Sequence, residues 1–187
     1  IHGKHYLIME RNSRNELRRI LLIDTRGELN PRSQLFVESL IGVGYEVTCL
    51  LWDRTADLAT REGTQGAAII RVGIKGRYAD ARSVCKILKV YWAMFRNMRK
   101  INFDVLHCCH LSLLPLAIVV SKIKKTKLVY DVHEFYTVGF FGRIPKWLSF
   151  LERIVIGCEK LATKYVSGVI CVPSRESAYY RMYCENT

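Results

Sequence analysis

Hydrophobic and polar positions along the chain follow two periodicities in turn. Short apolar runs rich in β-branched residues are typical of buried strands, and they are separated by segments with apolar positions three or four residues apart, which are typical of helices. The strand-like runs cover residues 19–24, 45–52, 68–72, 103–109, 127–131 and 168–172, and the helix-like segments cover 32–43, 80–100, 111–124 and 144–165. We interpret residues 55–66 as a loop and residues 1–17 as a polar N-terminal tail. Alternating strands and helices predict one α/β domain over residues 18–187, a parallel sheet covered by helices on both faces.

The clearest helix, residues 80–100, combines an apolar stripe with a basic face. We expect the stripe to face the core, because its members recur at helical spacing. The stripe consists of Val84, Ile87, Leu88, Tyr91, Phe95 and Met98, and the basic face of Arg82, Lys86, Lys89, Arg96 and Lys100.

Size and charge narrow the class of protein. The chain has 187 residues, half of them hydrophobic, which is enough for one core of ordinary domain size. The formal net charge of +12 predicts anionic partners such as phosphorylated substrates, acidic lipids or nucleic acid. Nucleic acid is the least favoured, because only the charge supports it. The chain opens on Ile1 and closes on a helical pattern without a stop signal, so we expect a piece of a longer protein.

The cysteines and the apolar runs predict a cytoplasmic setting. Seven cysteines without framework spacing, and no preceding signal peptide, fit a reducing compartment. The longest apolar run, Leu111–Val120, contains a proline and is far below the ~20 residues that a spanning helix needs.

The run His107-Cys108-Cys109-His110 has the residue types of a metal site. Neighbouring side chains on a strand point to opposite faces, which separates His107 and Cys109 from Cys108 and His110. Four ligands therefore cannot converge on one ion, and we expect no structural zinc here.

The strand at residues 127–131 leads directly into a cluster of titratable residues. Asp131, His133 and Glu134 stand at or just past its carboxyl end, and in open α/β sheets ligands bind outside the carboxyl ends of the strands. This position favours a chemical role. An ordinary polar group at a strand end is the alternative, and the pattern alone leaves it open.

Four stretches of the chain together resemble the amino-terminal domain of family 4 glycosyltransferases of the GT-B architecture. Each is a weak motif, but their order and spacing match the family from residue 19 to residue 177. They are residues 29–48, with Leu29-Asn-Pro-Arg32 and Gly44-Tyr-Glu-Val-Thr48; Phe103-Asp-Val-Leu-His107; Leu128-Val-Tyr-Asp-Val-His-Glu134; and the segment Glu159 to Ser174.

The resemblance implies a Rossmann-like doubly wound sheet and one half of an enzyme. It implies that a sugar is transferred from a nucleotide-sugar donor to a glycan or lipid-linked acceptor, as in polysaccharide biosynthesis, with retention and without a metal or other cofactor. The C-terminal domain that holds the nucleotide in the family is absent, so the chain alone should be inactive. Family members often carry two glycines after the first strand, whereas here Gly27 stands alone.

The resemblance also assigns roles to residues of this chain. His133 matches the family's cleft histidine, and Glu134 beside it can tune its proton affinity, which makes both catalytic candidates. Arg26 and Gly27 fall on the loop that faces the donor phosphates, where guanidinium and backbone N–H groups suit phosphate. An ordinary turn at Gly27 remains an equal alternative.

The segment after His133 is the candidate contact for an acceptor or a membrane. It is aromatic and contains glycine, and exposure of such a segment is costly without a partner. With the basic face of the helix at 80–100, it suggests docking on the inner face of an anionic membrane. The alternative is that these aromatics pack under the following helix. The candidate contact residues are Phe135, Tyr136, Phe140, Phe141 and Trp147.

A second function class stays open. The chain could be a non-catalytic α/β domain that binds a nucleotide or a protein partner. A dinucleotide site is disfavoured, because Gly42-Val-Gly44 follows a helix and precedes a strand, the reverse of the order that such a site requires.

Overall fold

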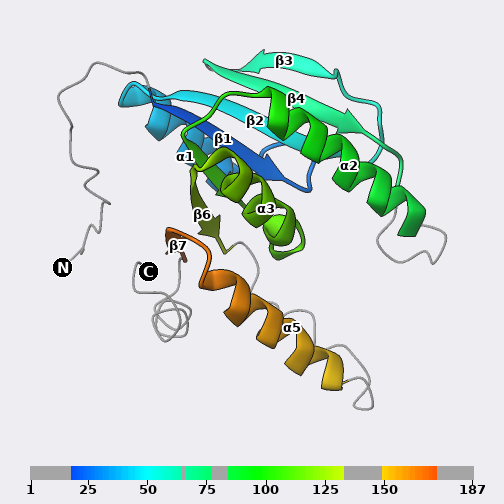
Figure 1. Cartoon of the computed structure of the whole chain (residues 1–187). Helices are drawn as coiled ribbons and strands as arrows, with labels where there is room; N and C mark the ends of the chain where they lie inside the picture. The colour runs from blue at the N-terminus through cyan, green and yellow to red at the C-terminus, as the bar shows by residue number, and fades with distance from the viewer. Residues whose placement is uncertain (1–17, 65, 77–83, 133–148, 172–187) are drawn as a thin grey trace.

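The computed structural model describes residues 18–64, 66–76, 84–132 and 149–171, without side chains for residues 64, 84–85 and 149–155. It shows one twisted sheet with helices packed against it (Figure 1). The strands are β1 Arg19–Asp24, β2 Glu46–Asp53, β3 Arg61–Thr64, β4 Ala67–Gly73, β5 Val105–Cys108, β6 Lys127–Asp131 and β7 Gly168–Ile170. The helices are α1 Pro31–Gly42, α2 Val84–Lys100, the short 3₁₀ turn η2 Leu111–Leu113, α3 Leu114–Lys124 and α5 Ser149–Thr163.

The sheet has the strand order β3-β4-β2-β1-β5-β6-β7. Every pairing is parallel except that of β3 with β4, which is antiparallel. Without β3, the parallel strands follow the 3-2-1-4-5-6 order of the doubly wound Rossmann fold. The predicted α/β fold class is therefore confirmed.

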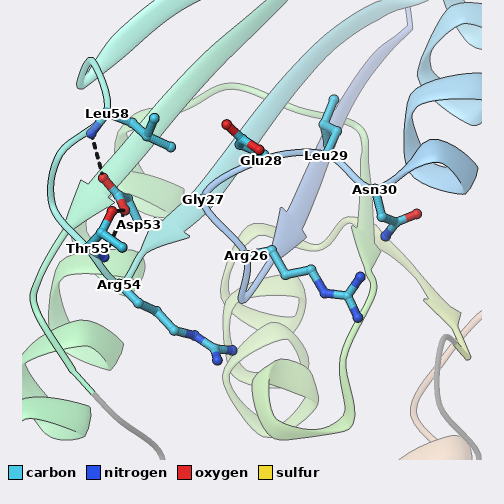
Figure 2. Close-up of a pocket in the computed structure, with 9 residues that line it drawn as sticks. All are labelled: Arg26, Gly27, Glu28, Leu29, Asn30, Asp53, Arg54, Thr55 and Leu58. Atoms are coloured by element: carbon cyan, nitrogen blue, oxygen red, sulfur yellow. Dashed lines mark hydrogen bonds between the residues drawn. The ribbon is translucent and has the colours of Figure 1, made fainter.

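All six parallel strands end at one edge of the sheet, where the loops after β1 and β2 lie next to one another (Figure 2). The order reverses between β1 and β5, because the chain adds strands on one side of β1 first and then on the other. Such a switch point is where ligands bind in folds of this type.

Strand β3 is a difference from the sequence-based expectation. Residues 55–66 were expected to be loop, yet Arg61–Thr64 pair with β4. The strand is polar, contains Gly63 and spans four residues. It therefore lacks the alternating apolar pattern by which a half-buried strand is recognised.

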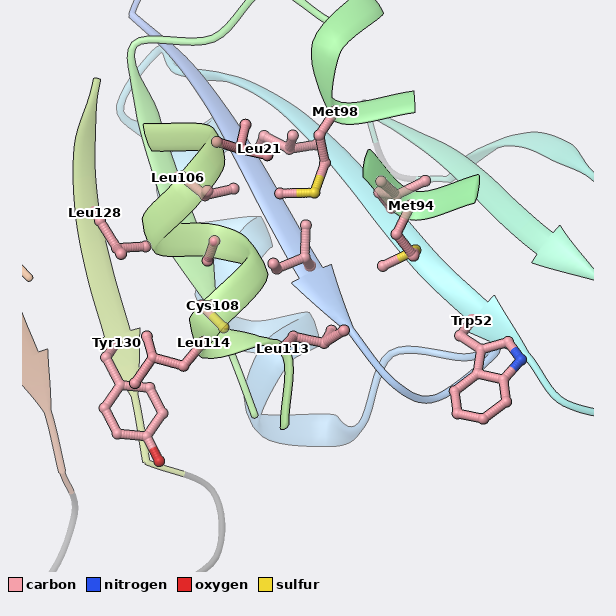
Figure 3. Packing of buried hydrophobic residues seen from close by; sticks show 14 of the residues in the cluster. Leu21, Trp52, Met94, Met98, Leu106, Cys108, Leu113, Leu114, Leu128 and Tyr130 are labelled. Carbon is pink, nitrogen blue, oxygen red and sulfur yellow. The ribbon is translucent and has the colours of Figure 1, made fainter. Parts of the chain in front are cut away.

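Successive side chains along the strands point to opposite faces of the sheet and pack into two separate cores. On one face Leu21 and Leu106 pack with α2 and α3, as Figure 3 shows. Ile23 belongs to the same cluster of buried residues. On the other face Leu22, Cys49 and Leu51 pack with Val37 of α1. Helices α2 and α3 thus cover one face and α1 the other, as the predicted two-faced covering requires. Ala162 of α5 and the following Val166 pack against the same core as α2 and α3.

Helix α2 is rotated relative to the predicted stripe. Met98 points into the core as predicted (Figure 3), but Met94 and Val90, which were not part of the predicted stripe, are buried as well. Leu88, which was expected in the core, is 65% exposed. The prediction was wrong at Leu88 because α2 carries apolar residues on its outward side as well. The expected basic face is confirmed for Lys86, Lys89, Arg96 and Lys100, which are exposed, whereas Arg82 lies outside the described residues.

The described helices include none that is both long enough and apolar enough to cross a membrane.

The rotation of α2 makes a paired test. Met94→Ala should lower the free energy of unfolding by about 2 to 5 kcal/mol, because it leaves a cavity among fully buried side chains. Leu88→Ala should change it by less than about 0.5 kcal/mol, since Leu88 is mostly exposed. Urea denaturation followed by circular dichroism measures both, and equal losses would contradict the assigned orientation of α2.

Candidate functional site

The switch point holds a buried pair of titratable side chains. Asp24 is the last residue of β1, and His110 follows β5 across the point where the strand order reverses. Asp24 Oδ1 lies 3.2 Å from His110 Nε2, and both residues are buried. The same carboxylate oxygen accepts a hydrogen bond from the Arg26 backbone N–H at 3.2 Å. The pair therefore lies between the loop after β1 and the end of β5.

A second buried group joins β5, β6 and α1. Asp131 accepts on one oxygen from His107 Nε2 at 3.2 Å and on the other from the Arg32 guanidinium. Arg32 also donates to the Val132 carbonyl at 3.1 Å, and the Phe36 ring lies 4.5 Å from the His107 ring. A carboxylate as deeply buried as Asp131 is tolerable because a cation and hydrogen bonds compensate it. Arg32 thus links the start of α1 to the carboxyl end of β6.

Beside these groups the loops after β1 and β2 enclose a pocket of about 530 Å³. Figure 2 shows the Arg26 and Arg54 side chains extending in the same general direction away from Gly27. The pocket leads toward the N-terminus of α1, where Asn30 caps the helix by accepting from the Ser33 N–H at 2.9 Å. Its lining residues are Arg26, Gly27, Glu28, Leu29, Asn30, Asp53, Arg54, Thr55 and Leu58.

Gly27 lies close to the backbone of Asp53, at the end of β2. A Cβ at this position would lie 3.1 Å from the Asp53 Cα and 3.1 Å from the Leu58 Cδ1. A side chain at this position would therefore force the Asp53 backbone or the Leu58 side chain to shift by a few tenths of an ångström.

Two guanidinium groups hold the loop that contains Gly27. Arg71 of β4 is buried and donates from Nε to the Gly27 carbonyl at 2.8 Å and from Nη1 to the Ala59 carbonyl at 2.9 Å. Its charge is offset by Glu62, whose Oε2 lies 2.8 Å from Nη1. Arg54 donates from Nε to the Thr25 carbonyl at 3.0 Å. The loop is therefore positioned by neighbouring strands.

Asp53 closes the other side of the pocket with a tight turn. Its carboxylate accepts from the Leu58 N–H at 2.9 Å, the Thr55 N–H at 3.0 Å and the Thr55 hydroxyl at 2.7 Å. Burial by itself would raise the pKa of Asp53, but these hydrogen bonds prevail and lower it from 3.8 to about 2. Asp53 is thus ionised at neutral pH and occupied in holding the turn.

Among the residues that the structure describes, one cluster has the atoms to hold a metal ion. Ligand atoms of His107, Cys109 and Asp131 lie within 4.8 Å of one another. As expected from alternation, His107 and Cys109 share a face, whereas Cys108 packs into the opposite core. Burial raises the pKa of the Cys109 thiol well above its ordinary value, and nearby Asp24 adds to this effect. A metal would have to displace the thiol proton and compete with Arg32 for Asp131, so the hydrogen-bonded network accounts for these residues better.

The structure places two of the predicted site residues in the pocket lining, Arg26 and Gly27. Their predicted role toward donor phosphates stays a prediction. The predicted catalytic residues His133 and Glu134 follow Val132, the last described residue of this stretch, and lie outside the described residues. The same holds for the predicted contact residues Phe135, Tyr136, Phe140, Phe141 and Trp147.

Sequence reasoning missed several residues at the edge of the sheet. Asp24, Arg32 and Arg54 were not proposed as site residues, and His107 and His110 were considered only as metal ligands. A signal existed for Asp24 and His110, because each stands at the end of an apolar strand, as His133 does. No local pattern marks Arg32, since its partners Asp131 and Val132 are about 100 residues away in sequence.

Comparison with solved structures finds similar chains, among them two of one enzyme that share the architecture of this chain. Sucrose-phosphate synthase from Thermosynechococcus elongatus is 15% identical, with a TM-score of 0.62, covering 90% of this chain and 46% of that one. A second structure of the same enzyme, from a twinned crystal, gives 15% identity and a TM-score of 0.61 over 90% of this chain and 84% of that one. Anabaena HepE in complex with UDP and glucose is 13% identical, with a TM-score of 0.49, covering 88% and 40%.

The chain therefore spans 46% of the first of these structures. The shared architecture is that of the amino-terminal half of a GT-B glycosyltransferase, as the sequence resemblance implied. No curated protein sequence matches the chain.

The sequence model of one family matches residues 34–184. The match extends from α1 past β7 and thus includes most of the chain. Given this match and the shared architecture, the chain belongs to Glycosyltransferase Family 4.

Proposed function

We propose that this chain forms the acceptor side of a cleft in which a sugar passes from a nucleotide sugar to a glycan or lipid-linked acceptor. The observation that carries the proposal is the pocket at the carboxyl ends of β1 and β2, beside the switch point and lined by Arg26, Gly27 and Arg54. Guanidinium groups and a helix N-terminus are suited to phosphate. The family membership supports sugar transfer as the reaction.

The loop after β1 is the part that faces the donor diphosphate in this proposal. Arg71 and Arg54 bind its carbonyl oxygens from the side of the neighbouring strands. A loop held in this way needs little rearrangement when an anion binds, which lowers the cost of reaching the reacting geometry.

The catalytic assignment follows from the resemblance. His133 donates or accepts a proton or hydrogen bond near the transferred sugar, and Glu134 tunes its proton affinity. Phe135, Tyr136, Phe140, Phe141 and Trp147 contact the acceptor. Retention of anomeric configuration is part of the same proposal.

The proposed reaction needs no bound metal. The basic groups of both halves and the helix N-termini compensate the leaving phosphates. Within this chain Arg32 occupies Asp131, the carboxylate that a metal at His107 and Cys109 would require.

The donor is held mainly by a second domain in this proposal, so the isolated chain should bind nucleotide sugars weakly and transfer nothing. Calorimetry with UDP- and GDP-sugars, compared between the isolated chain and the full-length enzyme, measures this. Micromolar affinity of the isolated chain for a nucleotide sugar would show that the second domain is not needed to hold the donor. It would favour the alternative, a non-catalytic nucleotide-binding domain.

A pair of glycine substitutions tests the loop. Gly27→Ala in the full-length enzyme should lower turnover by about tenfold or more, because the new methyl group pushes the loop away from Asp53 and misplaces its N–H groups. Gly42→Ala is the matched control, since a Cβ at Gly42 meets nothing within 4 Å. Steady-state kinetics that show both variants equal to the unmodified enzyme would contradict the role of the loop.

The histidine is tested against a core residue. His133→Ala in the full-length enzyme should lower turnover by about 10²-fold, the scale of a lost positioned polar group, with little change in melting temperature. Leu128→Ala, at a buried position of β6, should instead cost about 2 to 5 kcal/mol of stability. Intact turnover in the His133 variant, or unfolding as severe as in the Leu128 variant, would show the assignment to be wrong.

A further inference from the structure

The outward side of α2 is apolar at its centre. Met94 and Met98 point into the core (Figure 3), so the opposite side of this helix faces solvent. Leu88 and Trp92 stand there, 65% and 62% exposed. Trp92 stacks on Phe95 at a centroid distance of 5.8 Å. An exposed tryptophan supported by a second ring is a feature that calls for an explanation, because burial of such a ring is strongly favourable.

The neighbouring helices extend this apolar character. Helices α2, α3 and α5 pack against one core on one face of the sheet (Figure 1), and α3 contacts both of the others. Val119 and Ile123 of α3, Leu161 of α5 and Tyr165 just after α5 are about half exposed or more. We call the exposed apolar side chains on the solvent side of these helices the outer helical layer. They are Leu88, Trp92, Val119, Ile123, Leu161 and Tyr165.

Cations surround these apolar groups. Helix α2 contains no acidic residue over residues 84–100, and α3 contains none over residues 114–124. Helix α5 contains two acidic residues, Glu152 and Glu159. The side chain of Glu152 lies outside the described residues, whereas Glu159 is buried and its Oε1 accepts from the Tyr130 hydroxyl at 3.3 Å. The exposed cations on and beside the three helices are Lys86, Lys89, Arg96, Arg99, Lys100, Lys122, Lys125 and Lys164.

This combination of chemistry identifies one kind of partner. We propose that the outer helical layer docks on an anionic lipid surface, with Trp92 and Leu88 inserted at the headgroup level and the cations facing lipid phosphates. Apolar anchors flanked by lysines are the pattern of helices that lie in a membrane interface. Lysine is depleted in protein–protein interfaces, which argues against a protein partner for a surface this rich in lysine.

The inference rests on the proposed function in one respect, since attachment to a membrane would bring the cleft to a lipid-linked acceptor. Lipid binding itself needs neither donor nor acceptor. The surface can therefore be tested separately from the chemistry.

The experiment is co-sedimentation of the full-length enzyme with lipid vesicles, either of pure phosphatidylcholine or containing phosphatidylglycerol as well. Binding should require phosphatidylglycerol and should weaken between about 0.05 M and about 0.5 M salt, as screening shortens the reach of the charges. Trp92→Ala and the double variant Lys89→Gln/Arg96→Gln should each weaken binding by about tenfold. Leu35→Ala and Arg61→Gln, at exposed positions outside the outer helical layer, are the matched controls and should bind as the unmodified enzyme does.

Fluorescence provides a second readout of insertion. Tryptophan emission should shift to shorter wavelength when phosphatidylglycerol vesicles are added, because Trp92 leaves water, and Trp92→Phe should remove most of the shift. Equal binding to neutral vesicles, binding that salt does not change, or unaltered binding by the Trp92 and Lys89/Arg96 variants would each overturn the proposal.

One further outcome would reassign the surface, and two others separate this inference from the catalytic proposal. A dimer in gel filtration that Trp92→Ala dissociates, without any vesicle binding, would make the layer an interface between copies. If the enzyme does not bind vesicles but His133→Ala still lowers turnover, this inference is wrong and the catalytic proposal stands. Vesicle binding with no effect of His133→Ala would leave the inference standing and remove the catalytic proposal.

Discussion

The candidate site depends on a buried arginine that binds backbone carbonyl oxygens. Arg71 stands on β4, two strands away from β1, and reaches the Gly27 and Ala59 carbonyls. A buried guanidinium is costly unless its donors are satisfied, so the two loops must stay where their carbonyls meet it. Because Gly27 lies against the Asp53 backbone, this constraint also fixes the width of the pocket between the loops.

The two faces of the sheet serve different purposes. On the α1 face polar residues reach the edge of the sheet, where Arg32 joins α1 to Asp131 and Phe36 packs on His107. On the other face, the side chains between the sheet and helices α2, α3 and α5 are almost all apolar. The same helices carry cations and exposed apolar groups on their solvent side. The candidate site lies at the carboxyl edge of the strands and is therefore separate from the solvent side of these helices.

Much of the fold could be predicted from the chain because parallel strands buried on both faces are continuous apolar runs. Residues 19–24 and 127–131 were predicted with the boundaries that β1 and β6 have. Periodicity was right for Met98 of α2 and wrong for Leu88, because apolar residues on both sides of the helix allow two orientations and only packing against the sheet selects Met94 over Leu88. Strand β3 was missed because its four polar residues form a strand only through pairing with β4.

The site was predictable only in part. The loop at Arg26 and Gly27 follows a strand and could be located by that rule. The pairs Asp24–His110 and Arg32–Asp131 depend on which strands become neighbours and on their register, and local sequence does not contain that information. For the same reason the sequence did not mark Arg71, which is buried and links the two loops through the Gly27 and Ala59 carbonyls.

The antiparallel strand β3 has a consequence for the protein in solution. It occupies one edge of the sheet, a position whose unpaired backbone groups can recruit strands from other molecules and start aggregation. The edge is short and carries the exposed charged residues Arg61 and Glu62. Both features oppose the addition of a further strand, so the hairpin of β3 and β4 protects an otherwise long and strongly apolar sheet from polymerising.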